Sequence, residues 1–92
     1  MLMVSDNPAM HRFEMMSGDA VVYVGYQRLG DRTVPTHTEV LEAMSGRGVG
    51  SKLVAGVLDK IRSEAAKVVA RCELVAAFMK RHPGYQSLAI DE

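Results

Sequence analysis

Residues 45–53 read SGRGVGSKL, and three glycines stand there at alternate positions, directly before an amphipathic helical pattern. Glycine loses much backbone entropy on folding, so such a segment is typical of places where positive φ or the close approach of a ligand is required. A helix that begins near Val49 presents unpaired amide N–H groups and a positive partial charge, and phosphates bind to such groups. Arg47 could add an ion pair. The segment predicts a phosphate site, unless the glycines only turn the chain into the helix.

Three phosphate ligands compete for this segment. A Walker loop ends in Gly-Lys-Ser/Thr, whereas the order here is Gly50, Ser51, Lys52. A dinucleotide-binding loop needs G-x-G-x-x-G, and the spacing here is one residue short. The loop that holds the pyrophosphate of coenzyme A in N-acetyltransferases, Gln/Arg-x-x-Gly-x-Gly/Ala, fits at Gly48 and Gly50 but not at Ser45. Coenzyme A is therefore the ligand that the segment favours.

Cys72 stands between a buried type of strand and a helix that begins near Glu73. The dipole of a helix favours a thiolate at its N-terminus. Such a thiol could accept an acyl group or protonate a departing thiolate. Alternatively it is an inert core cysteine, because free cysteine is among the most buried residue types.

His37 lies in the middle of a predicted strand, on the same face as Glu39, with Thr36, Thr38 and Val40 on the other face. Imidazole exchanges protons near neutral pH, which suits a general base. A histidine in a strand can equally be structural, and the spacing alone does not separate the two roles.

The elements that must position these residues follow from the apolar patterns and the turn signals. Alternating and β-branched segments predict three strands joined by tight turns, followed by a helix, a strand and a second, shorter helix that Pro83 ends. This order indicates a mixed sheet with helices packed on it. Residues 1–9 are expected to be a loose end before a single domain at 10–92, and residues 85–92 to add a short strand or pack loosely. The predicted strands are 11–16, 20–29, 32–41 and 67–72, and the predicted helices are 49–65 and 73–82.

Composition restricts the classes of partner. The 11 basic and 11 acidic side chains cancel, so no overall attraction to nucleic acid or to an anionic membrane is indicated. The single cysteine forms no intrachain disulfide, and no apolar run approaches the ~20 residues of a membrane helix. We expect an intracellular, cytoplasmic protein, with no secretory signal and no metal.

Three segments together resemble the small, single-domain branch of the GNAT superfamily of N-acetyltransferases. They are HTEV at 37–40, GRGVGSKLV at 46–54 and KVVARCELVAAFMKRHPGY at 67–85, and the resemblance spans residues 10–88. It implies an α/β (α+β) fold, with a mixed, mostly antiparallel sheet whose central strands splay apart around acyl-coenzyme A, and two main helices.

The resemblance also implies an enzyme that transfers acetyl from acetyl-CoA to an amine that the sequence does not identify. Cys72 and His37 are the implied catalytic residues, facing each other across the splayed strands. Ser45 and Phe78 depart from the pattern, because relatives carry Gln or Arg and often tyrosine there. A coenzyme A-binding module without turnover, or an interaction protein that retains only the fold, therefore stays open. The implied residues that bind the co-substrate are Val40, Leu41, Gly46, Arg47, Gly48, Val49, Gly50 and Ser51.

Overall fold

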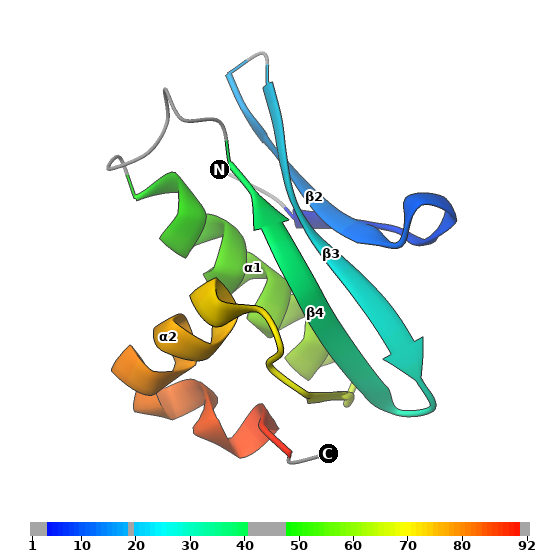
Figure 1. The fold of residues 1–92 in the computed structure, drawn as a ribbon, viewed down its shortest axis with the longest axis vertical. Helices are drawn as coiled ribbons and strands as arrows, with labels where there is room; N and C mark the ends of the chain where they lie inside the picture. Colours follow the sequence, from blue (N-terminus) through cyan, green and yellow to red (C-terminus); the bar gives the residue numbers. More distant parts are fainter. Residues whose placement is uncertain (1–3, 19, 41–47, 91–92) are drawn as a thin grey trace.

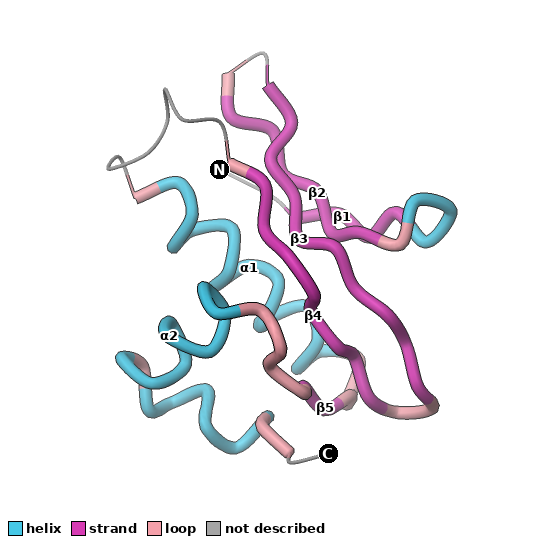
Figure 2. The backbone as a smooth tube through the Cα atoms, viewed as in Figure 1, coloured by secondary structure: helices cyan, strands magenta, loops and turns pink. Residues whose placement is uncertain are grey.

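The computed structural model describes residues 4–18, 20–40 and 48–90. Within them, five strands form one sheet in the order β1-β2-β3-β4-β5, with β1 to β4 antiparallel and β5 parallel to β4 (Figures 1 and 2). The sheet is mixed and mostly antiparallel, and with two main helices it confirms the predicted fold class. The strands are β1 (Val4–Asn7), β2 (Arg12–Ser17), β3 (Ala20–Leu29), β4 (Arg32–Glu39) and β5 (Lys67–Val68), and the helices are α1 (Val49–Ser63) and α2 (Glu73–Arg81).

The antiparallel meander forms where the alternating pattern predicts it, with β3 at the predicted residues. A tight turn at Gly30, with φ of 66°, joins β3 to β4. The register of this pair shifts next to Pro35, which faces Tyr26, whereas His37 faces Gly25. Because proline has no N–H to donate, an irregularity of the ladder at this point is expected. The shift leaves Thr38 opposite Val24, a core residue on the inner face.

One hydrophobic core joins the inner face of the sheet to both helices. The apolar stripe of α1 is buried at every position that the periodicity singles out from Val49 to Ile61. It packs with inward residues of β2 and β3, such as Phe13 and Val24. Residues of α2, among them Val75, belong to the same cluster. The core therefore fixes the position of both helices, and with it the position of their N-termini, relative to the sheet.

The N-terminal segment is more ordered than the sequence analysis expects of residues 1–9. Residues 4–7 form β1, which pairs with β2 from Val4–Met15 to Asn7–Arg12. Side chains also tie the strand down, because the hydroxyl of Tyr26 donates to Asp6 Oδ1 and Arg28 donates to Asp6 Oδ2. Asp6 and Arg28 are 22 positions apart in the sequence, so no local pattern predicts that they meet.

Three other expectations need correction. The strand expected at 67–72 is limited to Lys67–Val68, because the chain then leaves β4 to enter α2 (Figure 2). In the described part of the tail, up to residue 90, no further strand forms; Pro83–Leu88 is a 3-10 helix and Ala89 makes an isolated bridge to Val68. Helix α1 ends at Ser63 rather than at residue 65. Among the described helices, none has the length and apolar character to cross a membrane.

Candidate active site

The strands β4 and β5 run side by side only briefly. They pair at Arg32–Lys67 and Thr33–Val68, and Cys72 N donates to Pro35 O at 3.1 Å. Past that bond β4 runs on to Glu39, while the other chain segment turns into α2 (Figure 1). Within the described ranges, the edge of β4 beyond Pro35 that faces away from β3 has no neighbouring strand. This separation of the two chain segments is what splayed central strands imply.

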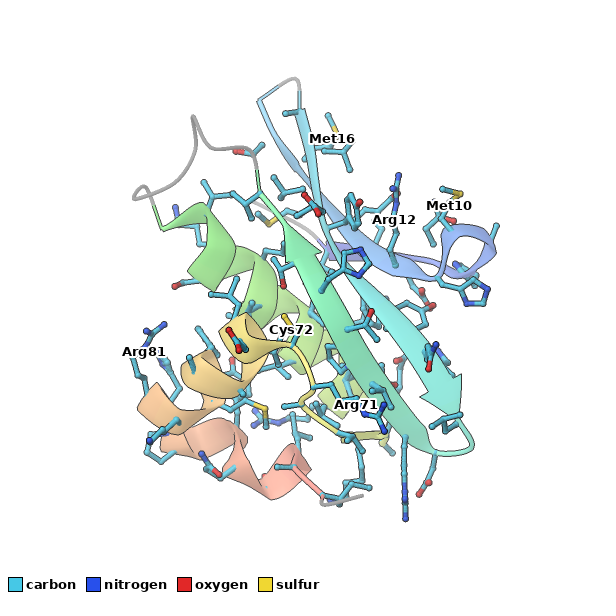
Figure 3. The ribbon with its side chains drawn as sticks, viewed as in Figure 1. Met10, Arg12, Met16, Arg71, Cys72 and Arg81 are labelled. Atoms are coloured by element: carbon cyan, nitrogen blue, oxygen red, sulfur yellow. The ribbon has the colours of Figure 1, made fainter. Side chains whose placement is uncertain are left out.

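Cys72 lies at that separation and contacts β4 through its side chain. It is the N-cap residue of α2, yet its thiol does not cap the helix. Its Sγ lies 3.3 Å from Oγ1 of Thr38, and the residue is 6% exposed. Figure 3 shows the sulfur between the start of α2 and β4. The cysteine is thus a core residue whose polar atom has a defined partner at this separation.

His37 lies on the opposite side of β4. Its ring is seated on Gly25, where a Cβ atom would overlap the imidazole, and it meets the ring of Tyr23 edge-on at 5.8 Å. Its Nδ1 lies 3.2 Å from Oγ1 of Thr36. Neighbouring side chains of a strand point to opposite faces, so Thr38 and His37 face different ways. The expectation that His37 and Cys72 face each other is therefore not met, and the thiol meets Thr38 instead.

The first turn of α1 has amide donors without an acceptor inside the helix. Gly48 is the N-cap, with φ of 74°, and it provides no side-chain cap. The first helical hydrogen bond runs from Lys52 N to Gly48 O, at 3.0 Å. The preceding amides, Val49 to Ser51, consequently have no acceptor within the helix. The first turn also carries no acidic side chain, so nothing there opposes an anion.

The end of β4, the start of α1 and the start of α2 meet at Gly50. A Cβ atom on Gly50 would lie 3.7 Å from Cδ2 of Leu74 and 4.0 Å from Cγ2 of Val40. Leu74 is 38% exposed, although it is large and apolar. The fold thus brings five of the implied co-substrate residues, Val40 and Gly48 to Ser51, to one place. The other three, Leu41, Gly46 and Arg47, lie outside the described residues.

Two site residues were missed by the sequence reasoning. The sequence assigns Thr38 only to the strand face opposite His37. The same alternation directs its side chain toward the segment that carries Cys72. Leu74 lies in the helix predicted at 73–82 and outside its buried positions, which are Val75, Phe78 and Met79. An apolar residue in the first turn, off the buried stripe, was the available signal.

Phe78 stands where resembling proteins often carry tyrosine, and its ring is enclosed. It is 4% exposed and stacks on His82 at 4.1 Å, with Tyr85 at 5.7 Å. Burial raises the pKa of Tyr85, whose hydroxyl also donates to Asp59 at 2.9 Å. These rings pack the end of α2 against the 3-10 helix, and the site at the start of α2 does not need them.

Comparison with known proteins agrees with this architecture. The family model described as GCN5-related N-acetyl-transferase matches residues 12–88, which confirms the resemblance. An NMR solution structure of a GCN5-like putative N-acetyltransferase from Staphylococcus aureus superposes with a TM-score of 0.71 and 21% sequence identity, covering 97% of this chain and 88% of that one. At this identity the likeness shows the fold alone. No curated protein sequence matches the chain significantly.

Proposed function

This chain belongs to the family of GCN5-related N-acetyltransferases, and from that premise we propose that it transfers acetyl from acetyl-CoA to a primary amine. The convergence at Gly50 is the observation that carries the proposal. It brings the first amides of α1 to the end of β4, on the side where β4 separates from the segment that carries Cys72. A ligand with a pyrophosphate at one end and a thioester at the other fits the two ends of such an arrangement.

The co-substrate would lie along the free edge of β4. Its pyrophosphate would accept hydrogen bonds from the amides of Gly48 to Ser51, with Gly46 and Arg47 completing the loop. The pantetheine arm would run past the exposed side chain of Leu74. The N–H of Val40 or Leu41 would polarise the thioester carbonyl, a contribution that is often the largest in acyl transfer.

Two routes complete the transfer. In the direct route the amine nitrogen attacks the thioester carbonyl, the C–S bond breaks, and coenzyme A leaves as a thiolate that Cys72 protonates. In the covalent route the Cys72 thiolate attacks first and coenzyme A leaves. The amine then attacks the new thioester and frees the thiol, which gives ping-pong kinetics. In the direct route the thiolate left on Cys72 takes back a proton that the amine loses. Either route thus converts a neutral amine and acetyl-CoA into one acetylated amine and one coenzyme A thiol, and an amine that arrives as ammonium gives up one further proton.

His37 is the proposed receiver of the amine proton, by way of water. Its ring is exposed on the far side of β4 from Cys72, so a direct transfer from the reacting centre is not proposed. His37→Gln is expected to lower kcat at neutral pH and leave the KM for acetyl-CoA unchanged. An unchanged kcat would leave bulk water as the proton acceptor.

The test of the function is acetyl transfer by variants of the single cysteine. Purified protein is incubated with acetyl-CoA and a set of amines, such as a polyamine, a lysine peptide and small primary amines. Release of coenzyme A is followed together with the intact mass of the protein. Cys72→Ala is compared with Val69→Ala, a truncation at a residue that is equally 6% exposed and outside the site.

We expect Cys72→Ala to lose most of the transfer and Val69→Ala to keep it. An acetyl adduct on the wild-type protein that is missing from Cys72→Ala would select the covalent route. Binding of acetyl-CoA without transfer to any amine would overturn the proposal and favour a binding module. The proposal extends the single domain expected at 10–92 to include β1, and it takes this domain to act in the cytoplasm, without nucleic acid, in line with the balanced charge and the single cysteine.

A further inference from the structure

We propose that Thr38 is the positioning residue for the Cys72 thiol: its hydroxyl donates a hydrogen bond to the sulfur and holds it, as thiolate, where β4 separates from the segment that carries Cys72. The inference rests on the covalent route of the proposed function, in which the Cys72 thiolate attacks the acetyl group; the direct route would need the neutral thiol as a proton donor. Its test below has a readout that does not depend on acetyl transfer.

The contact between the two side chains is long-range and is fixed at both ends. Oγ1 of Thr38 and Sγ of Cys72 lie 3.3 Å apart, across 34 positions of sequence. On the Cys72 side, the backbone N donates to Pro35 O, so the residue is anchored to β4 by its main chain as well. On the Thr38 side, the register shift next to Pro35 places the residue opposite Val24, on the inner face. The pairing follows from the geometry of the sheet and does not depend on the free rotation of an exposed side chain.

The surroundings make this hydroxyl important for a charged sulfur. Cys72 is 6% exposed and belongs to the hydrophobic cluster, so a thiolate there has little water to stabilise it. A buried charge needs hydrogen-bond donors. The N-terminus of α2 supplies a favourable dipole. Oγ1 of Thr38 lies within hydrogen-bond distance of the sulfur, and the proposal takes the hydroxyl as the donor. Removal of that hydroxyl therefore takes away the hydrogen-bond partner of the sulfur at this place.

The experiment separates the hydroxyl of Thr38 from its packing. Thr38→Val keeps the shape and removes the hydroxyl, whereas Thr38→Ser keeps the hydroxyl and removes the methyl group. Cys72 is the sole cysteine of the chain, so alkylation by iodoacetamide reports on this one sulfur. Rates are measured at one fixed pH for the three proteins, folded and again in urea, where the variants must react equally. Circular dichroism confirms that each variant folds.

We expect Thr38→Val to slow alkylation of the folded protein by about tenfold, because a hydrogen bond to a charged group is lost. Thr38→Ser is expected to stay within about twofold of the wild type, since its hydroxyl keeps that bond. Alkylation of Thr38→Val at the wild-type rate or faster would overturn the inference. The threonine hydroxyl would then accept a hydrogen bond from the thiol, or have no effect on the sulfur. A Thr38→Ser protein that is as slow as Thr38→Val would also overturn it.

Acetyl transfer by the same variants distinguishes the two proposals. If both hold, kcat falls in Thr38→Val and returns in Thr38→Ser, while the KM for acetyl-CoA changes little. If alkylation responds as expected but no variant or wild-type protein transfers acetyl, the pairing of Thr38 with Cys72 stands and the proposed function fails. If transfer is intact in Thr38→Val, the positioning role fails and the function stands.

Discussion

Gly56, in the middle of α1, leaves room for Val4 of β1. A Cβ atom added at Gly56 would overlap Cγ2 of Val4 and lie 3.3 Å from its Cβ. The contact joins the N-terminal strand to the helix that carries the proposed phosphate site. We therefore predict that Gly56→Ala has opposite effects on stability depending on the residue at position 4.

The magnitude follows from two opposing terms. Alanine is favoured over glycine in a helix interior by about 1 kcal/mol. Forcing an extra methyl group into a packed contact costs roughly 1–3 kcal/mol. Val4 is branched at its Cβ, so the clash is not relieved by moving the end of a long side chain. In the wild-type background the clash exceeds the gain, and Gly56→Ala destabilises the protein by about 1 kcal/mol.

In a Val4→Ala background the overlapping methyl group is gone. Gly56→Ala should then stabilise the protein by up to about 1 kcal/mol, through helix propensity. Urea unfolding of wild type, both single variants and the double variant forms a double-mutant cycle, with an expected coupling of about 2 kcal/mol. Equal stabilisation by Gly56→Ala in both backgrounds would refute the reasoning, because β1 would then not rest on α1 at this point.

Three further predictions test the site and the N-terminal tie. Gly48→Ala places alanine in a left-handed conformation and should lower the unfolding free energy by about 1–2 kcal/mol. Gly84→Ala, at a glycine without positive φ, is the control and should be nearly neutral in the same thermal melts. Equal effects of the two substitutions would contradict this prediction. Asp6→Asn weakens the hydrogen bonds that Tyr26 and Arg28 donate to this side chain. In urea unfolding it should lower the unfolding free energy by about 1 kcal/mol. An unchanged urea midpoint would contradict this prediction. Burial, followed by the bond to Asp6, raises the pKa of Tyr26, so its contribution is complete below about pH 10 and is lost as the pH rises through the raised value. Unfolding free energy should therefore fall at alkaline pH, less steeply in Tyr26→Phe, and an identical slope in that variant would count against the bond.

Much of the fold could be predicted because its signals are local. The β-branched run at Ala20–Leu29 and the helical stripe from Val49 to Ile61 each carry their own period, and both elements formed where the patterns indicated. The short strand at Val4–Asn7 has no such period. It pairs with β2, which follows it closely in the sequence, and it rests on α1, which lies far along the chain.

The candidate site could be predicted by segment but not by pairing. The glycines predict where α1 begins, and the structure confirms that Cys72 directly precedes α2. Which side chain meets the thiol depends on the register of β4. Pro35 predicts an irregularity in this strand, but residue types do not give the register that results from it. The sequence therefore does not identify Thr38 as a site residue, whereas it does identify His37, one position away.

The central claim is that the start of α1 binds the pyrophosphate of acetyl-CoA. The direct measurement is a titration of isotope-labelled protein with acetyl-CoA, followed by the amide resonances, with pantetheine lacking the pyrophosphate as the control ligand. The account predicts saturable shifts at Val49, Gly50 and Ser51 with acetyl-CoA, and much smaller shifts there with pantetheine. Resonances of Val49, Gly50 and Ser51 that do not move at millimolar acetyl-CoA would contradict the claim and leave SGRGVGSKL as a glycine-rich start of a helix.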